Sequence, residues 1–451
     1  MFHELKFENC AHSQDPLVSC ALEGVANVIA GIRDVAVVIH SPQGCSATVA
    51  AAYDNHEIDF TRRKVACSRL FESDIIMGAT QKLKELILQA DQSFQAKVMF
   101  VVGTCAADII GEDLEAVCRA MQGQVKARLI SVMAGGFRGN AYDGMNLGLS
   151  ILAKLIQPVP ILPEETPVTQ AKVNLILPQA NLNPTWWADM EWVRSILAQI
   201  GVATHTVLAR NLTLEDLARA AEAPYSILLN HDAGHAFAQK LSSLGSQAIL
   251  AELPLPIGVE NTGRWLRALG CQFHAEEKVE EIIQKGESRV QDILRKRGLM
   301  IIPRYRNCRI AISADCTIGI PLVRALFNEL EMIPELLLFR SESPEARRLL
   351  DAELQALQIT PQVVFNADGW KTKSALLESG VDAVLGSSWE KYLAEELGIK
   401  LAFDVLNPTN RDLYVDRPYF GYEGYLYLLE AIGNEWEAAF RSKEIVWEQF
   451  Q

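Results

Sequence analysis

Lys97-Val98-Met99-Phe100-Val101-Val102-Gly103-Thr104-Cys105 is an apolar run that ends in a glycine, a threonine and a cysteine. An apolar run without alternation predicts a strand that is buried on both faces, as in a parallel sheet. Val35–Ile39 has the same character and precedes Cys45. Such runs alternate with amphipathic helical patterns along almost the whole chain, and this order predicts doubly wound α/β units.

Seven further apolar runs are predicted to be buried strands: 127–132, 172–177, 226–229, 309–312, 335–338, 362–365 and 383–385. The predicted helices between the strands include 80–89, 114–121, 189–199, 213–220 and 320–330.

Two interruptions divide this pattern into three Rossmann-like domains, each a mostly parallel sheet flanked by helices. Residues 157–167 are dense in proline, cannot continue a helix and are predicted to be a linker. A charged helix from Glu276 to Arg297 ends near Gly298 and marks the second boundary. We therefore expect an N-terminal α/β domain over 1–157, a middle domain over 168–298 and a C-terminal domain over 299–451. In the last domain, 422–447 should return as a helix.

Composition narrows the function. The 451 residues are 49% hydrophobic and 22% charged, which suits a globular protein of two or three domains. A formal net charge of −14 argues against nucleic acid or an anionic membrane as the main partner. No apolar run approaches the roughly 20 residues of a membrane span. The first residues lack the pattern of a signal peptide, so we expect a cytoplasmic location.

Three of the nine cysteines share a setting that sets them apart. Cys45 and Cys105 each follow a predicted strand, and Cys20 begins the helix that leads into the first of these strands. Loops beyond the carboxyl ends of parallel strands are where ligands collect, and thiolates are the ligands of iron–sulfur clusters. The spacing predicts an iron–sulfur site at Cys20, Cys45 and Cys105. Three thiolates are one fewer than a four-thiolate site needs, which suggests that a second subunit completes it.

Nearby residues supply further candidates. Gly24, Gly44 and Gly103 are expected to let the backbone approach a bulky cluster closely. Cys10 is an alternative fourth thiolate, whereas Cys67 is interpreted as a buried or supporting residue.

Other polar and aromatic residues that could serve a function can be explained equally well by a structural role. His40 is expected to form a hydrogen bond with the backbone. His231 and His235 are spaced as metal ligands on a helix would be, but helix capping by Asn230 explains the local polarity equally well. The pair Trp186-Trp187 is interpreted as core or interface packing.

At the cysteines the chain resembles the catalytic-component subunits of the nitrogenase superfamily, and the resemblance covers nearly its whole length. The blocks that carry it are 104–114 around Cys105, 72–78, 136–139, 186–190, 256–262 and 420–424. The resemblance implies that Cys20, Cys45 and Cys105 match the three P-cluster cysteines that each subunit of such a heterodimer contributes.

Two departures from the family pattern favour a β-type subunit. The segment resembling the cofactor-binding cysteine site of α-type subunits is Leu228–His235, which has no cysteine, and Phe420 stands where those subunits have a histidine. A third departure concerns the enzyme. Molybdenum nitrogenase β subunits have a serine near the P-cluster where this chain has Gly136. This difference favours a nitrogenase-like reductase, for which methylthio-alkane reductase is our specific hypothesis.

The resemblance implies an electron-relay function. An ATP-hydrolysing iron protein would deliver electrons to an [8Fe-7S] P-cluster, or alternatively a [4Fe-4S] cluster, shared with an α-type subunit in an α2β2 heterotetramer. The α-type partner would hold the active-site metal cofactor and bind the small-molecule substrate. The alternatives are the β subunit of a vanadium or iron-only nitrogenase, a cofactor-assembly scaffold, and a cluster-free α/β protein with a small ligand.

Overall fold

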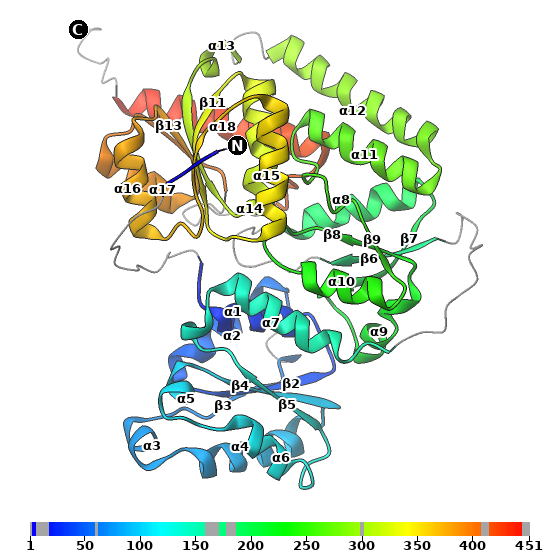
Figure 1. The fold of residues 1–451 in the computed structure, drawn as a ribbon, viewed down its shortest axis with the longest axis vertical. Helices are drawn as coiled ribbons and strands as arrows, with labels where there is room; N and C mark the ends of the chain where they lie inside the picture. Colours follow the sequence, from blue (N-terminus) through cyan, green and yellow to red (C-terminus); the bar gives the residue numbers. More distant parts are fainter. Residues whose placement is uncertain are drawn as a thin grey trace.

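The computed structural model describes residues 2–5, 18–58, 62–157, 171–176, 186–297, 302–406 and 415–443. Within these ranges the chain forms three sheets, and every strand pairing in them is parallel. Helices cover the sheets, and the N-terminal sheet lies apart from the other two in Figure 1. The predicted fold class, α/β with three parallel sheets flanked by helices, is confirmed.

The N-terminal sheet has the strand order β3-β2-β4-β5. Its strands are β2 (Val35–His40), β3 (Val65–Cys67), β4 (Val98–Gly103) and β5 (Arg128–Met133). Its helices are α1 (Ala21–Ala30), α2 (Gln43–Asn55), α3 (Glu72–Met77), α4 (Thr80–Phe94), α5 (Cys105–Ile109), α6 (Leu114–Met121) and α7 (Ala141–Ala153), with a short 3-10 turn η2 (Gly136–Arg138). Gly24 and Gly144 allow α1 and α7 to cross closely, because a Cβ on Gly24 would lie 1.8 Å from the carbonyl oxygen of Ala141.

The middle sheet has the order β7-β6-β8-β9. Its strands are β6 (Lys172–Ile176), β7 (Ala203–Leu208), β8 (Tyr225–Leu228) and β9 (Gln247–Ile249). The associated helices are α8 (Trp186–Gln199), α9 (Leu214–Ala218), η4 (Ala220–Glu222), α10 (His235–Ser243), α11 (Val259–Phe273) and α12 (Glu276–Arg297).

The third sheet has the order β1-β12-β11-β10-β13-β14, so the first strand of the chain joins the last sheet. Its strands are β1 (His3–Glu4), β10 (Arg309–Ala314), β11 (Ile333–Phe339), β12 (Gln362–Val364), β13 (Ala383–Gly386) and β14 (Leu401–Asp404). The helices are α13 (Ile302–Tyr305), α14 (Cys316–Arg324), η6 (Ala325–Glu329), α15 (Pro344–Leu357), α16 (Gly369–Ser379), α17 (Ser388–Leu397) and α18 (Gly421–Lys443). The last helix returns across the third sheet towards α11 and α12 (Figure 1).

Apolar clusters join the three parts. One cluster contains residues of the middle sheet, the third sheet and α18, such as Val173, Ile310 and Ile432. Another contains Val37 of the N-terminal sheet and Leu208 of the middle sheet. The predicted linker, from residue 158 on, and the boundary at 298/299 lie outside the described residues, so both domain limits stay predictions. No described helix has the length and apolar character that a membrane crossing needs.

Two differences from the sequence prediction have clear causes. The predicted helix 320–330 is instead the end of α14 followed by the π-helical turn η6. Pro321 lies inside α14 and cannot donate a backbone hydrogen bond, which is a common reason for a helix to change its geometry. In addition, β1, β3, β7, β9 and β14 were not predicted; each is an edge strand of its sheet.

Candidate functional site

The three predicted cysteines lie at one edge of the N-terminal sheet. Cys20 is the N-cap of α1, Cys45 is in the first turn of α2 after β2, and Cys105 begins α5 after β4. The paired strands β2 and β4 are parallel, so their carboxyl ends, and the loops that follow, meet at the same place. The cysteines that the sequence singled out are therefore brought to a common edge.

The loop after β5 brings Cys20 and Cys105 together. The backbone N–H of Gly136 donates a hydrogen bond of 2.9 Å to Cys105 Sγ. A Cβ built on Gly136 would lie 3.3 Å from Cys20 Cβ and 3.4 Å from Cys105 Sγ, so both cysteines border this glycine. The N–H group supplies the backbone donor near sulfur that tunes an iron–sulfur centre, at a residue that the sequence did not identify for this role.

An ion pair fixes the loop that carries Gly136. Arg138 donates to both carboxylate oxygens of Asp108, at 2.7 and 3.2 Å, and thereby ties η2 to α5. Gly135 packs beneath this pair, since a Cβ there would lie 2.6 Å from Asp108 Oδ2. Asn140 caps α7 next in the chain, and Cys20 pairs with it as an isolated antiparallel bridge. Contacts at both of its ends thus hold the loop against the edge of the N-terminal sheet where the cysteines lie.

Cys45 completes the group of thiols. Burial raises the pKa of Cys45, the thiols of Cys105, Cys20 and Cys67 act in the same direction, and the hydroxyl of Thr104 opposes them. The thiols are therefore close enough to influence one another. Metal ions bind the thiolate form of cysteine and displace its proton.

The donor set fits a cluster better than a single ion. In the described part of the chain, no three Cys, His, Asp or Glu side chains are arranged to hold one metal ion. A multi-iron cluster is bound at several iron atoms, so its thiolates need not converge on one point. Around Gly44, beside Cys45, a Cβ would meet no atom within 4 Å, which leaves space at this part of the edge. The residues present fit thiolate ligation of an iron–sulfur cluster.

Two glycines have a different role from the predicted one. Gly24 packs against α7, as described above. A Cβ on Gly103 would lie 2.5 Å from Met133 Sδ and 2.6 Å from Leu114 Cδ1, so this glycine accommodates the packing of β4. Of the three glycines that were predicted to let the backbone approach a cluster, only Gly44 has open space around it.

The other candidates near the cysteines differ in their surroundings. Cys10 lies outside the described residues. Cys67 ends β3, and its Sγ lies 3.6 Å from the hydroxyl of Ser41, so it is held beside the group. His40 is fully buried, and neither ring nitrogen has a hydrogen-bond partner among the described residues, which contradicts the expected backbone bond. Its Nε2 lies 3.7 Å from Glu112 Oε2, and burial lowers the pKa of the ring.

The segment 230–235 connects the middle and third sheets. Asn230 Oδ1 accepts from the backbone N–H groups of Asp232 and Ala233, which closes a turn. It does not cap α10 as expected, because the N-cap of that helix is Gly234 and no described side chain caps it. Asp232 in turn accepts from the N–H groups of Cys316 and Thr317, both at 2.8 Å, and so caps α14. These contacts explain the polarity of the segment without a metal.

Phe420 is buried and packs against other aromatic side chains. Its ring packs edge-on against Trp192, with centroids 6.2 Å apart. The N–H groups of Tyr419 and Phe420 donate to Asp189 Oδ1, at 2.6 and 3.0 Å. The residue therefore packs in the apolar interior and offers no ligand.

Large apolar side chains are exposed on the loops and helices around the cysteines. Among the described residues these are Phe71, Ile75, Ile76, Met77, Ile109 and Phe137, which we call the apolar rim. Ile76 and Met77 are 80% and 84% exposed. Both α3 and α5 lie at the same end of the N-terminal sheet (Figure 1). Apolar side chains gathered in this way mark a protein interaction surface.

The chain is an α/β protein with three parallel sheets, and three cysteines lie at one edge of the first sheet. Comparison with known proteins gives its family. The sequence model of the nitrogenase component 1 type oxidoreductases matches residues 20–437. A solved structure of nitrogenase Cp1 at pH 6.5 shares the fold, with a TM-score of 0.76 and 18% identity over 98% of this chain and 96% of that chain. The chain belongs to the nitrogenase component 1 type oxidoreductase family.

Within this family the chain is of β type. The nitrogenase vanadium-iron protein β chain of Trichormus variabilis is 25% identical over 456 residues, which cover 93% of each chain. The nitrogenase iron-iron protein β chain of Rhodobacter capsulatus is 22% identical over 461 residues, which cover 95% of each chain. Membership implies iron–sulfur clusters, an α-type partner chain and an iron protein.

Proposed function

We propose that this chain is the β-type subunit of a nitrogenase-like two-component reductase. Its part is to hold one half of an iron–sulfur centre at the contact with an α-type subunit. The observation that carries the proposal is the common edge of Cys20, Cys45 and Cys105, together with the N–H of Gly136 that donates to Cys105 Sγ. When bound, such a centre supplies one-electron transfer between an iron protein and the partner's cofactor.

The residues of this chain would bind and tune the centre. Cys20, Cys45 and Cys105 are the proposed ligands, and the N-terminal α/β domain over 1–157 is the part that binds the cluster. Cys45 and Cys105 stand at the starts of α2 and α5. The N–H of Gly136 would donate to the sulfur of Cys105 in the bound centre.

The remaining ligands would come from a second chain. Three cysteines are too few for a four-thiolate site, and the exposed apolar rim includes Ile109 of α5, the helix that Cys105 begins, and Phe137, which follows Gly136 in the chain. This combination supports a P-cluster of the [8Fe-7S] type shared with an α-type subunit in an α2β2 heterotetramer, and an ATP-hydrolysing iron protein as the electron donor. A [4Fe-4S] centre shared in the same way is the alternative.

The substrate would be reduced in the partner. Phe420 and the segment 230–235 provide no cofactor ligands, which supports a cofactor held by the α-type chain. For the reaction we propose reduction of the carbon–sulfur bond of small methylthio-alkanes. Gly136, which stands where molybdenum nitrogenase β subunits have a serine, supports an enzyme other than that one.

A second candidate is the β subunit of a vanadium or iron-only nitrogenase. It is favoured by the similarity to the β chains of both kinds over nearly their full lengths. The two candidates share the site and differ in the substrate, so one assay separates them. The complex, with its iron protein and ATP, is supplied with either a methylthio compound or dinitrogen. Release of methanethiol supports the first candidate, and ammonia without methanethiol supports the second.

The ligand assignment is tested by metal analysis. The Cys20→Ala, Cys45→Ala and Cys105→Ala variants, purified anaerobically with the partner chain, should lose most of the iron and acid-labile sulfide of this centre and its EPR signal. Cys271→Ala is the matched control, because Cys271 is an exposed cysteine on α11. An unchanged EPR signal in the Cys45→Ala and Cys105→Ala variants would refute the assignment.

A further inference from the structure

A cavity of about 550 Å³ lies between the N-terminal and middle sheets. One wall is formed by the stretch before β2 and by the end of α2, and the other by Trp187 of α8 and by Arg210 and Asn211 after β7. The cysteines follow the opposite end of β2. At about 3.3 Å per residue, this strand separates the cavity from them by about 16 Å. The cavity is therefore a separate site.

Its size and position are those of a ligand site. Small-molecule sites are typically about 300–1,000 Å³ in volume. Trp187 begins α8 after β6, and Arg210 follows β7. These are the carboxyl ends of two parallel strands, where open α/β sheets bind ligands.

The charge of the cavity is opposite to that of the protein. Among the described residues that line it, four have cationic side chains, Arg33, Arg62, Lys64 and Arg210, and one has a carboxylate, Glu57. The chain as a whole carries a net charge of −14. Within the described residues, the side chains of Arg33, Arg62 and Lys64 form no ion pair. This excess of cations over carboxylates in an acidic protein indicates an anionic ligand.

Arg210 is the anchored member of this group. Its guanidinium stacks on Trp187, 3.5 Å from the ring centroid, and its Nη2 donates to Glu57 at 2.6 Å. The side chain is only 9% exposed, and its Nη1 has no hydrogen-bond partner in the described structure. A fixed guanidinium with a free donor is the arrangement that binds a carboxylate or phosphate.

His56 adds an acceptor. Its Nε2 lies 2.7 Å from the carbonyl oxygen of Asn27, so the ring proton is on Nε2. Burial lowers the pKa of His56 to about 4, and the ring is neutral at physiological pH. The Nδ1 lone pair is buried and has no partner among the described residues. A hydroxyl group of a ligand is a suitable donor to it.

We propose that this cavity binds a small organic polyanion, with two or more carboxylate or phosphate groups and a hydroxyl. The cationic side chains bind the anionic groups, and His56 accepts from the hydroxyl. This site is independent of the proposed cluster, because none of the described residues that line it is a cysteine. A cluster-free Cys45→Ala variant should bind the anion as well as the native protein does.

The test is calorimetric titration of the full-length chain, purified with its partner subunit. Citrate represents hydroxy-polycarboxylates and ADP represents phosphates. We expect at least one to bind with a dissociation constant below about 1 mM, and tricarballylate, which is citrate without the hydroxyl, to bind about tenfold more weakly than citrate. Arg62→Ala and Lys64→Ala should each weaken the binding about tenfold or more. Arg119→Ala, an exposed residue of α6, is the control and should leave it unchanged.

Three results would overturn the proposal. The first is that neither citrate nor ADP binds. The second is that binding is the same in the Arg62→Ala and Lys64→Ala variants, which places it elsewhere. The third is that these variants release the partner subunit while the anion binds only to the free chain, which makes the cavity a protein contact. Arg62 is exposed, and the melting temperature of its variant verifies that the fold is intact.

Discussion

The backbone N–H of Gly136 points at Cys105 Sγ over 2.9 Å, and the same glycine leaves only narrow space towards Cys20. A single loop residue therefore contacts two of the three proposed ligands. Side chains at this position would change the geometry of both sulfurs.

We expect Gly136→Ala to disturb the centre without unfolding the protein. The new methyl group would lie 3.3 Å from Cys20 Cβ, so Cys20 must move by a few tenths of an ångström, and 3.4 Å from Cys105 Sγ, which places it in van der Waals contact with that sulfur. The iron content should fall by about half, and the EPR signal should change in shape, because hydrogen bonds and geometry at sulfur tune such centres. Gly123→Ala is the control, since a Cβ there meets nothing within 4 Å. Equal iron content and spectra in both variants would contradict the expectation.

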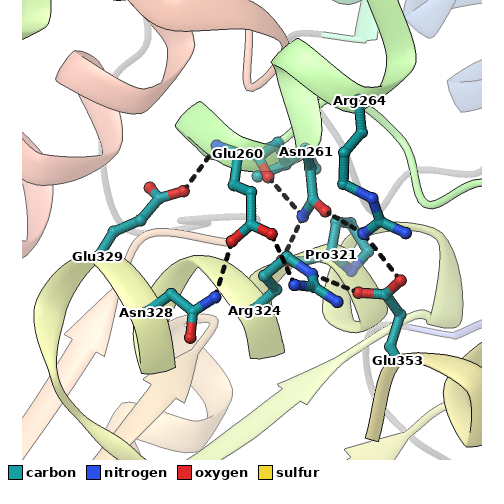
Figure 2. Close-up of polar contacts among 9 residues, drawn as sticks. Glu260, Asn261, Arg264, Pro321, Arg324, Asn328, Glu329 and Glu353 are labelled. Carbon is teal, nitrogen blue, oxygen red and sulfur yellow. Dashed lines mark hydrogen bonds and ion pairs between the residues drawn. The ribbon is translucent and has the colours of Figure 1, made fainter. Parts of the chain in front are cut away.

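A buried ion-pair network connects α11 with α14 and α15 (Figure 2). Arg324, 7% exposed, pairs with Glu353 at 2.6 Å and with Glu260 at 2.7 Å, while Arg264 pairs with Glu353 at 2.8 Å. Arg324→Ala leaves the buried Glu353 with one partner and should lower the free energy of unfolding by about 3 kcal/mol. Urea denaturation measures this change.

The matched control is an exposed pair on a single helix. Arg119 and Glu115 are spaced i,i+4 on α6 and are both about two-thirds exposed. Arg119→Ala should change the unfolding free energy by less than about 0.5 kcal/mol. Similar losses of unfolding free energy in the two variants would show that the buried network contributes no more stability than an exposed ion pair does.

The strands that the sequence revealed, and those that it did not, differ in position. The predicted strands include every interior strand of the three sheets, such as β2, β4 and β10, which are apolar on both faces. The five unpredicted strands are all edge strands. In β7 three polar residues, Thr204, His205 and Thr206, follow one another and interrupt the apolar run, and β1 and β9 have two and three residues. Edge strands need little apolar surface, so periodicity reveals them poorly.

The candidate site was predictable in part for a similar reason. Cysteines at strand ends are visible in the sequence, whereas a backbone donor has no signature of its own; Gly136 was singled out only by the family resemblance, as the position of a serine near the P-cluster. The cavity beside Arg210 was not predictable, because its lining residues are up to 179 positions apart, from Ile32 to Asn211. Only the packing of the middle sheet on the N-terminal one brings them together.

The stability should depend on pH through Asp315. Burial raises the pKa of Asp315 to about 8, and the neighbouring Asp232 acts in the same direction. Between about pH 4 and pH 8 the folded state keeps a proton that the unfolded chain has lost, so stability falls as the pH rises through this range. Asp315→Asn removes this dependence while keeping an acceptor for the N–H of Ile318. Melting temperatures from pH 5 to 8 should therefore fall less in the variant.

Asp113→Asn provides the comparison for this pH series. Asp113 also caps a helix, since it accepts from the N–H of Ala116 at 2.9 Å, but its position is solvent-exposed. Its variant should show the same pH slope as the native protein. A slope in Asp315→Asn as steep as in the native protein would mean that another group is responsible.

The apolar rim should be a binding surface for a partner protein. Ile76 and Met77 are the two most exposed members, and neither has a place in the core, so the double substitution Ile76→Asp and Met77→Lys should leave the melting temperature unchanged. Apolar side chains at the centre of an interface contribute about 2 kcal/mol or more each when they are removed. We therefore expect binding of the iron protein, or retention of the α-type subunit, to weaken at least about thirtyfold.

Leu377→Asp, on α16 and 68% exposed, is the control for an equally exposed apolar residue away from the cysteines. Size-exclusion chromatography with light scattering follows the subunit, and surface plasmon resonance follows the iron protein. Because α3, which carries Ile76 and Met77, lies at the same end of the N-terminal sheet as α5 (Figure 1), a loss confined to the rim variant would connect partner binding with the edge that carries the thiols. Unchanged binding of both partners in the rim variant, or an equal loss in Leu377→Asp, would show that this surface is not the contact.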